Sequence, residues 1–323
     1  MTIWEPTEKT LSNAAQILIK GGIVAIPTET VYGLAADATQ SVAVEKIFLI
    51  KKRPSINPLI IHVPDPSMVN ELAATDSRFH ELTTVFWPGP LTIVLKQKAK
   101  NKISELVSSG LTTLAVRQPN HPVTSEILRK VQRPIAAPSA NMSGAVSPTR
   151  ATHVEDSIGQ HVNVIIDGGR CKVGLESTVI DLSTDVPVIL RPGVITQEQI
   201  GQIIGFVNLS SHDSDLPKSP GQLAKHYAPS LPLRLNAEEA REGEAFLAFS
   251  KAGKAAIDLS PSGNLLEAAR NLFFLLRHVD KPDLYSSIAV MPIPEVGIGI
   301  AINDRLQRAA QLHGQESALH NHL

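Results

Sequence analysis

Cysteine is almost absent from this sequence of 323 residues, in which Cys171 is the single example. One thiol cannot form an intramolecular disulfide or provide a cysteine-based metal site, and such usage fits a reducing compartment. Aromatic residues are scarce as well, with 8 Phe, 3 Tyr and 2 Trp in the whole chain. This scarcity disfavours an RNA-binding surface built from exposed stacking side chains.

No charge of one sign predominates, because 30 basic residues stand against 31 acidic ones. A polyanion must therefore be bound by a local cluster of cations and not by the net charge of the chain. No apolar stretch approaches the roughly 20 residues needed to cross a bilayer, and the first residues lack the pattern of a secretory signal. We therefore expect a soluble cytoplasmic protein that does not bind membranes.

The common motifs for nucleotide binding and hydrolysis are also missing. The chain has no GxxxxGK(S/T) loop, no GxGxxG after a strand, no GxSxG and no HExxH. A motif search alone would therefore miss an ATP site. What remains is a set of polar residues at the ends of apolar, strand-like segments.

The length is sufficient for about two domains. Helical spacing occurs at 11–20 and 41–52, and short apolar runs predict strands at 23–26, 59–63, 91–96, 113–116, 134–138, 164–167, 177–182 and 186–191. We therefore predict an α/β domain with a mixed sheet over residues 1–207. Residues 208–232, rich in Ser, Pro, Asp and Gly, are interpreted as a linker, and 233–323 as a smaller α/β domain.

The segment PTETVYGL at 27–34 follows an apolar strand and carries Thr28, Glu29 and Thr30 where the chain leaves the core. Binding residues commonly lie on such loops. A strand-to-helix turn capped by threonines would explain the same pattern, and both interpretations stay open.

The segment KKRPSINPLIIH at 51–62 places Lys51 and Arg53 at the end of a helix, before a loop stiffened by two prolines. Two such cations suit phosphate or carboxylate oxygens, which arginine can bind bidentately. Cations that complement the helix C-terminus would have the same positions. Asn57 and His62 follow, and a histidine in an apolar strand is commonly a packed core residue.

Further polar residues follow other strands. Arg117 in VRQP and Arg191 in ILRPG end apolar segments, and APSAN carries Ser139 and Asn141 with Ser147 nearby. If the strand ends converge, these residues form a concave anion site with the two cations of the 51–62 segment. Taken singly, they are surface arginines and an ordinary Ser/Asn turn.

Two more motifs complete the pattern. Ser177 begins the strand of ESTVID, and Tyr227 in HYAP lies in the linker, where its ring could stack on a base. A capped strand and a packed loop tyrosine are the alternatives.

In this order and spacing, the motifs resemble those of the YrdC-like threonylcarbamoyl-AMP synthases. FWPGPLT (86–92) and SPGQLAKHYAP in the linker are similar too, and AINDRL (301–306) resembles the end of the family's long two-domain form. The resemblance implies a twisted mixed-sheet α/β domain with a basic cavity, followed by a Rossmann-like domain. It also implies condensation of L-threonine, bicarbonate and ATP, with Mg²⁺, to threonylcarbamoyl-AMP and pyrophosphate.

The resemblance further implies roles for individual residues. Threonine would be surrounded by Thr30, His62, Arg117, Ala137 and Ser177. ATP would be held by Arg53, Asn57, Thr113, Ser139, Ser147, Arg191 and Tyr227. The reacting centre would contain the tetrad Lys51, Arg53, Ser139 and Asn141. No residue is assigned as a metal ligand.

The product would feed the machinery that forms N6-threonylcarbamoyladenosine in tRNA, while direct binding of tRNA is left open. Residues 208–232 are expected to fold over the cavity when ligand is bound, with Tyr227 reaching the nucleotide and the second domain anchoring the lid. An RNA-binding module of the same fold, or a carbamoyl-transferring domain of a larger enzyme, are the rival interpretations.

Overall fold

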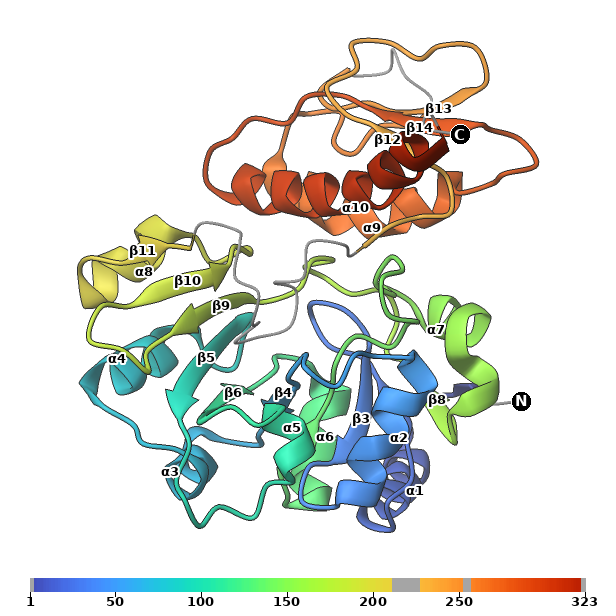
Figure 1. The fold of residues 1–323 in the computed structure, drawn as a ribbon. Coiled ribbons are helices and arrows are strands. Elements are labelled where there is room, and N and C mark those ends of the chain that lie inside the picture. The colour runs from blue at the N-terminus through green and yellow to red at the C-terminus, as the bar shows by residue number, and fades with distance from the viewer. Residues whose placement is uncertain (1–2, 211–226, 252–256, 321–323) are drawn as a thin grey trace.

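The computed structural model describes residues 3–210, 227–251 and 257–320, which form a large N-terminal and a small C-terminal unit (Figure 1). Eleven strands in the described part of the larger unit make one sheet, in the order β1-β8-β2-β3-β7-β4-β6-β5-β9-β10-β11. Strand β4 runs parallel to β6 and antiparallel to β7, so the expected mixed sheet is confirmed. The strand bounds are β1 Ile3–Trp4, β2 Val24–Ile26, β3 Gly33–Asp37, β4 Ile60–His62, β5 Leu91–Lys96, β6 Thr113–Arg117, β7 Ile135–Ala136, β8 Val164–Ile166, β9 Thr178–Asp181, β10 Val188–Arg191 and β11 Asn208–Leu209.

Helices cover both faces of this sheet. Successive residues of a strand point to opposite faces. Ala25 of β2 accordingly belongs to the same core cluster as Ile47 of α2, whereas Val24 belongs to that of Leu18 in α1 and Leu128 in α6. The helix bounds are α1 Glu8–Ile19, α2 Ser41–Lys51, α3 Val69–Leu72, α4 Ser77–Phe86, α5 Glu105–Ser108, α6 Pro122–Val131, α7 Ala151–Ile158 and α8 Gln197–Ile204, with 3-10 turns at Pro66–Met68 and Gly159–His161.

The PTETVYGL segment connects two strands and does not lead into a helix, so the strand-to-helix interpretation was wrong. Gly33 begins β3, which pairs with β2 in antiparallel orientation. The residues of β3, Gly-Leu-Ala-Ala-Asp, have a weak intrinsic preference for strand. Burial of all five between neighbouring strands decides their conformation, because tertiary packing overrides local propensity.

The smaller unit is a three-stranded parallel sheet with the order β12-β14-β13, covered by two helices. This arrangement confirms the predicted second α/β unit. Its elements are β12 Leu233–Arg234, β13 Glu244–Leu247, α9 Leu265–Val279, β14 Ser287–Val290 and α10 Ile298–His320.

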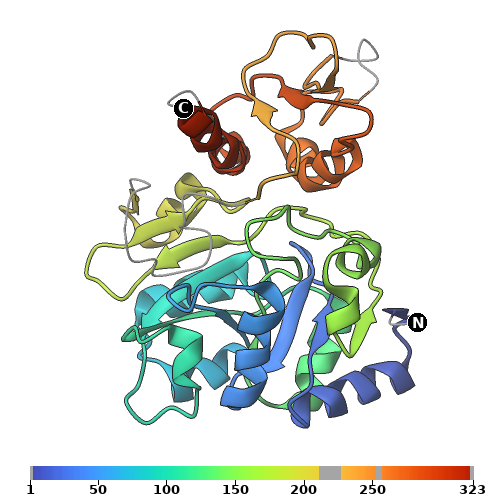
Figure 2. The ribbon, with the colours of Figure 1, turned by 45° about the vertical axis from the view of Figure 1, so that its right-hand side comes forward.

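The two units share one packed seam. Val31 and Leu175 of the larger unit belong to the same core cluster as Phe273 of α9. Gly174 has a φ of +75°, and a Cβ there would lie 2.5 Å from the backbone oxygen of Arg270. A residue without a side chain is therefore required where α9 approaches the larger unit. The turned view shows α9 above the loops before and after α7, and α10 above β9 and β10 (Figure 2).

Residues 211–226 of the predicted linker lie outside the described ranges, and Lys225 and His226 with them. The domain limits at 207 and 233 stay predictions, although Asn208 and Leu209 form β11 alongside β10.

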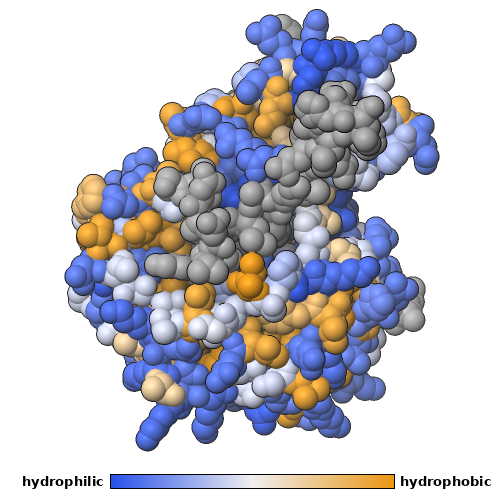
Figure 3. Space-filling view, viewed as in Figure 1, coloured by the Kyte–Doolittle hydropathy of each residue, from blue (hydrophilic) through white to orange (hydrophobic). Residues whose placement is uncertain are grey.

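No helix in the described ranges is long and apolar enough to span a membrane. On the face shown in Figure 3, hydrophobic residues occur in patches separated by hydrophilic ones.

Tyr32→Phe is expected to destabilise the fold by about 1–3 kcal/mol, because the buried Gly169 carbonyl oxygen and Gly168 N–H lose the hydroxyl that they bond. The Tyr32 hydroxyl donates to the Gly169 carbonyl oxygen at 2.8 Å and accepts from the Gly168 N–H at 3.1 Å. Urea unfolding measures the change. Tyr285→Phe is the matched control and should cost much less, because Tyr285 is only half-buried and its hydroxyl makes no hydrogen bond to the described residues. Equal losses in both variants would contradict the assignment.

Candidate active site

The larger unit contains a hollow of about 520 Å³ on the side that faces the second unit. Polar and charged side chains dominate its wall. The lining residues are Thr28, Thr30, Val31, Gly33, Arg53, Ile60, His62, Arg117, Ala137, Pro138, Ser139, Glu176, Ser177, Arg191 and Tyr227. They come from strand ends and from the loops that follow them, as the sequence pattern indicated.

Two cations at this site come from the end of α2. Lys51, the last residue of the helix, is 1% exposed, and its Nζ donates to the carbonyl oxygens of Ser139 at 2.6 Å and Asn141 at 2.5 Å. Arg53 Nε donates to the Asn57 carbonyl oxygen at 3.0 Å, and its Nη2 donates to that of Pro58 at 2.8 Å. Backbone oxygens therefore fix both cations without neutralising their charge.

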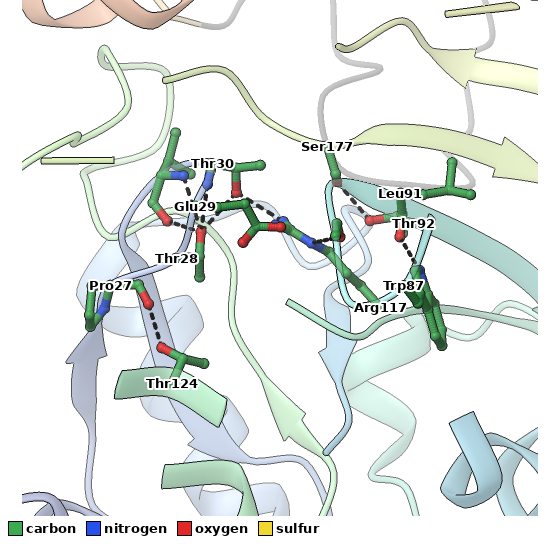
Figure 4. Close-up of polar contacts among 12 residues, drawn as sticks. Pro27, Thr28, Glu29, Thr30, Trp87, Leu91, Thr92, Arg117, Thr124 and Ser177 are labelled. Carbon is green, nitrogen blue, oxygen red and sulfur yellow. Dashed lines mark hydrogen bonds and ion pairs between the residues drawn. The ribbon is translucent and has the colours of Figure 1, made fainter. Parts of the chain in front are cut away.

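Two further arginines approach from the sheet. Arg191, at the end of β10, donates from Nε and Nη2 to the Ser177 carbonyl oxygen at 3.1 and 3.0 Å. Arg117, at the end of β6, donates from Nε to the Gly89 carbonyl oxygen at 3.1 Å and from Nη1 to Thr30 Oγ1 at 2.9 Å (Figure 4). Both side chains are buried.

Burial of these cations disfavours their charged forms. It lowers the pKa of Lys51 well below its ordinary value, and the neighbouring Arg53 lowers it further. Burial also lowers the pKa of Arg53, to about 9, and that of Arg191. A bound anion would reverse these shifts, so the site is electrostatically prepared for negative charge.

His62 ends β4 directly beside Arg117 on β6. Burial and the Arg117 charge together lower the pKa of His62 to about 3. The imidazole is therefore neutral near pH 7. A neutral ring can donate one hydrogen bond and accept another, which suits a substrate hydroxyl or amine.

Nine of the residues that the sequence predicted line the hollow. They include all five residues assigned to threonine, which are Thr30, His62, Arg117, Ala137 and Ser177, and four assigned to ATP, which are Arg53, Ser139, Arg191 and Tyr227. The structure thus brings the two predicted subsites together in one space. The role of each residue stays a prediction.

Four other predicted residues lie behind this wall and shape it. Besides Lys51, these are Asn57, whose carbonyl oxygen holds Arg53, and Ser147, whose Oγ donates to Glu176 at 2.5 Å. The Asn141 amide donates to the carbonyl oxygens of Met142 and Ala145, both at 2.8 Å, and so closes its own loop.

Thr113 is the predicted residue that the structure separates from the rest. It begins β6, pairs with Lys96 and does not line the hollow, whereas Arg117 ends the same strand. Four residues of extended chain span about 13 Å. Thr113 therefore lies at the opposite end of the strand from the Arg117 side of the site.

Sequence reasoning missed the direct contact between Glu176 and the second unit. Glu176 is buried. Its Oε1 accepts a hydrogen bond from Ser147 Oγ, and its Oε2 accepts one from Arg305 Nε of α10 at 3.1 Å. Arg305 Nη1 also donates to the Pro192 carbonyl oxygen at 2.9 Å and to Asp304 at 2.7 Å. The acidic residue that precedes Ser177 in the ESTVID motif was the available signal, but a glutamate before a strand is usually a solvated residue.

The second unit also holds Tyr227 in the wall of the site. The Tyr227 ring stacks on Phe273 of α9, with centroids 5.4 Å apart, and the Arg305 guanidinium lies 5.4 Å from the ring centroid. The next residue, Ala228, donates its N–H to the Gly144 carbonyl oxygen at 2.8 Å. Tyr227 therefore reaches the site, as predicted, and its position depends on α9 and α10.

No cluster of three or more His, Cys, Asp or Glu side chains that could hold a metal ion occurs in the described part of the chain. Glu176 is the carboxylate in the wall, and both of its oxygens already accept hydrogen bonds. The described side chains alone therefore do not build a resident metal site.

The fold and the site define an α/β enzyme that binds a polyanion beside a small polar molecule. The Sua5/YciO/YrdC family model, described as telomere recombination, matches residues 16–193, and the model for the threonylcarbamoyl-AMP synthase C-terminal domain matches 195–311. The chain belongs to the threonylcarbamoyl-AMP synthase family, in its long two-domain form.

Individual relatives support this membership over nearly the full length. The chain is 39% identical to the threonylcarbamoyl-AMP synthase of Bacillus subtilis, over 93% of this chain and 92% of the relative. It is 38% identical to that of Pyrococcus abyssi, over 92% and 93%. A solved structure of P. abyssi Sua5 complexed with L-threonine superposes with a TM-score of 0.88 at 36% identity, covering 96% of this chain and 98% of the other.

Binding of ATP is expected to be accompanied by proton uptake near pH 9, because burial lowers the pKa of Arg53 to about that value and the incoming anion raises it again. Calorimetry in buffers of different ionisation enthalpy measures the number of protons. Lys51→Met should reduce the uptake. Lys46→Met is the control, since Lys46 lies on the same helix with its Nζ bonded to the Gly21 carbonyl oxygen. Equal uptake in the two variants would contradict the electrostatic account of the site.

Arg305→Met is expected to destabilise the protein by about 3–5 kcal/mol, because it leaves the Glu176 carboxylate buried without its cation. Adding Glu176→Gln to this variant should restore part of the loss, since a neutral amide needs no counter-charge. Denaturant unfolding of the single and double variants measures both effects. Arg270→Met, at an exposed position of α9, is the control and should change little. Additive losses in the double variant would contradict a direct pairing.

Proposed function

We propose that this chain condenses L-threonine, bicarbonate and ATP to threonylcarbamoyl-AMP and pyrophosphate. One observation carries the proposal. Buried cations held by carbonyl oxygens and a group of polar residues around Arg117 meet at the same hollow. Membership of the family supports the same activity. The P. abyssi relative was solved with L-threonine, and we propose the same ligand for this chain.

Arg117 and His62 are placed to hold threonine. The Arg117 guanidinium can bind the substrate carboxylate, and charge-assisted pairs of this kind are the stronger hydrogen bonds. The neutral imidazole of His62 can accept a hydrogen bond from the substrate amine or hydroxyl. The amine nitrogen would then form a bond to the carbon of bicarbonate, with loss of water, to give a carbamate.

The cations at the other side of the hollow would serve the nucleotide. A carbamate oxygen forms a bond to the α-phosphorus of ATP, and the bond from that phosphorus to the β-phosphate oxygen breaks to release pyrophosphate. Negative charge gathers on the phosphates and the carbamate in this step. Lys51, Arg53 and Arg191 are fixed by backbone oxygens and can stabilise that charge without reorganising.

Magnesium enters the proposal as part of the nucleotide substrate. Because both oxygens of Glu176 already accept hydrogen bonds, we assign the ion to the phosphates and to water, which Mg²⁺ retains readily. It would neutralise charge on the departing pyrophosphate. The enzyme is proposed to act in the cytoplasm, where its labile product would be consumed by the machinery that transfers the threonylcarbamoyl group to tRNA.

The purified full chain is expected to release pyrophosphate from ATP only when both L-threonine and bicarbonate are present. Serine should react more slowly by a factor of about 5, because one missing methyl group is worth about 1 kcal/mol. Arg53→Ala should abolish turnover with little change in the melting temperature. Turnover of ATP that ignores the amino acid would overturn the proposal, and RNA binding without turnover would favour the rival RNA-binding module.

A further inference from the structure

Glu29 is a buried carboxylate to which neither the resemblance nor the reaction assigns a role. Its residue is 5% exposed and stands between Thr28 and Thr30, which line the hollow. Glu29 Oε1 lies 2.6 Å from Arg117 Nη2, so the carboxylate is directed at the proposed carboxylate-binding arginine (Figure 4).

The loop fixes this direction through a chain of hydroxyl groups. Arg117 donates to Thr30 Oγ1, and Thr28 Oγ1 donates to the Val31 carbonyl oxygen at 2.6 Å. Because the Thr28 hydrogen is used there, Thr30 must donate in the 2.8 Å bond between the two hydroxyls. The segment around Glu29 is therefore a tight turn tied to the same guanidinium.

The two oxygens of Glu29 accept no hydrogen bond from the described residues. Buried carboxylate oxygens are normally hydrogen-bonded, and leaving them without donors is costly. The ion pair with Arg117 balances the charge and places one guanidinium nitrogen against Oε1, but Oε2 has no donor among the described residues. Glu176 makes the contrast within the same site, since each of its oxygens accepts a hydrogen bond.

An amino acid supplies the missing groups. Its α-ammonium carries a positive charge and three N–H donors, and its α-carboxylate needs a cation. In this hollow an ammonium would otherwise face Arg53, Arg117 and Arg191, with the Glu176 oxygens already engaged. Glu29 lies behind the lining residues Thr28 and Thr30, and with Arg117 it offers the opposite charge for each end of the zwitterion.

We propose that Glu29 binds the α-ammonium group of the amino-acid substrate while Arg117 binds its carboxylate. The pair then selects amino acids over the corresponding 2-hydroxy acids. This inference rests on the proposed function, because it takes threonine as the substrate.

The test compares the binding of L-threonine and of 2,3-dihydroxybutanoate with the same configuration, in which a hydroxyl replaces the ammonium. Calorimetry with the full chain, without ATP, gives both dissociation constants. The wild-type chain should bind threonine at least about 10-fold more tightly, the usual scale for a charged hydrogen bond. Glu29→Gln should weaken threonine binding about 10-fold or more and change hydroxy-acid binding less than about 3-fold, so that the preference disappears.

Glu244→Gln is the matched control, because Glu244 is a carboxylate paired with Arg234 in the second unit and does not line the hollow. It should keep the preference for threonine. Glu29→Asp retains the charge on a shorter side chain and should keep part of the preference, which allows the test if Glu29→Gln does not fold.

Two contrary outcomes are distinguishable. If Glu29→Gln weakens both ligands equally, or leaves the preference intact, Glu29 acts only as the counter-ion of Arg117 and the inference is overturned. If the wild-type chain binds neither threonine nor its analogue, the proposed function fails, and the inference fails with it.

Discussion

The site depends on one constraint, which is that buried cations must be held without being neutralised. Lys51, Arg53 and Arg191 are fixed by carbonyl oxygens at the ends of helices and strands. Carbonyl dipoles orient a cation and satisfy its N–H groups, but they leave its formal charge in place. Burial then makes the positive charge costly, which the lowered pKa values express. A bound polyanion relieves this cost, so part of the binding free energy of the nucleotide comes from the burial of these cations.

The second unit belongs to this arrangement because it closes one wall of the hollow. Arg305 of α10 reaches Glu176, and Phe273 of α9 stacks on Tyr227. Gly174 permits the close approach of α9 that these contacts require. A rigid seam of this kind explains why the end of the linker carries a residue of the site. The second unit positions residues of the site in this structure, and the closing of residues 208–232 over a bound ligand stays a prediction.

Much of the site could be predicted from the sequence because polar residues stand out where apolar strands end. Arg117 and Arg191 were found in this way, and the mixed sheet followed from the spacing of the strands. Thr113 lies at the other end of the strand from Arg117, because one strand has two ends and the sequence does not say which end faces the ligand; its role toward ATP stays a prediction. The partnership of Glu176 with Arg305 joins residues 129 positions apart, and no local pattern encodes it. The loop that carries Glu29 was recognised as a binding candidate, but β3 after it was not distinguished from a helix, because its residues have a weak preference for strand.

The central claim is that the nucleotide phosphates lie against the carbonyl-anchored cations and the amino acid lies at Arg117. A crystal structure of the full chain with L-threonine and a non-hydrolysable ATP analogue tests it most directly. The account predicts phosphate oxygens within hydrogen-bonding distance of Arg53 and Arg191, and the threonine carboxylate on the Arg117 guanidinium. Phosphates bound elsewhere, with Arg53 and Arg191 keeping the partners they have in this structure, would contradict it.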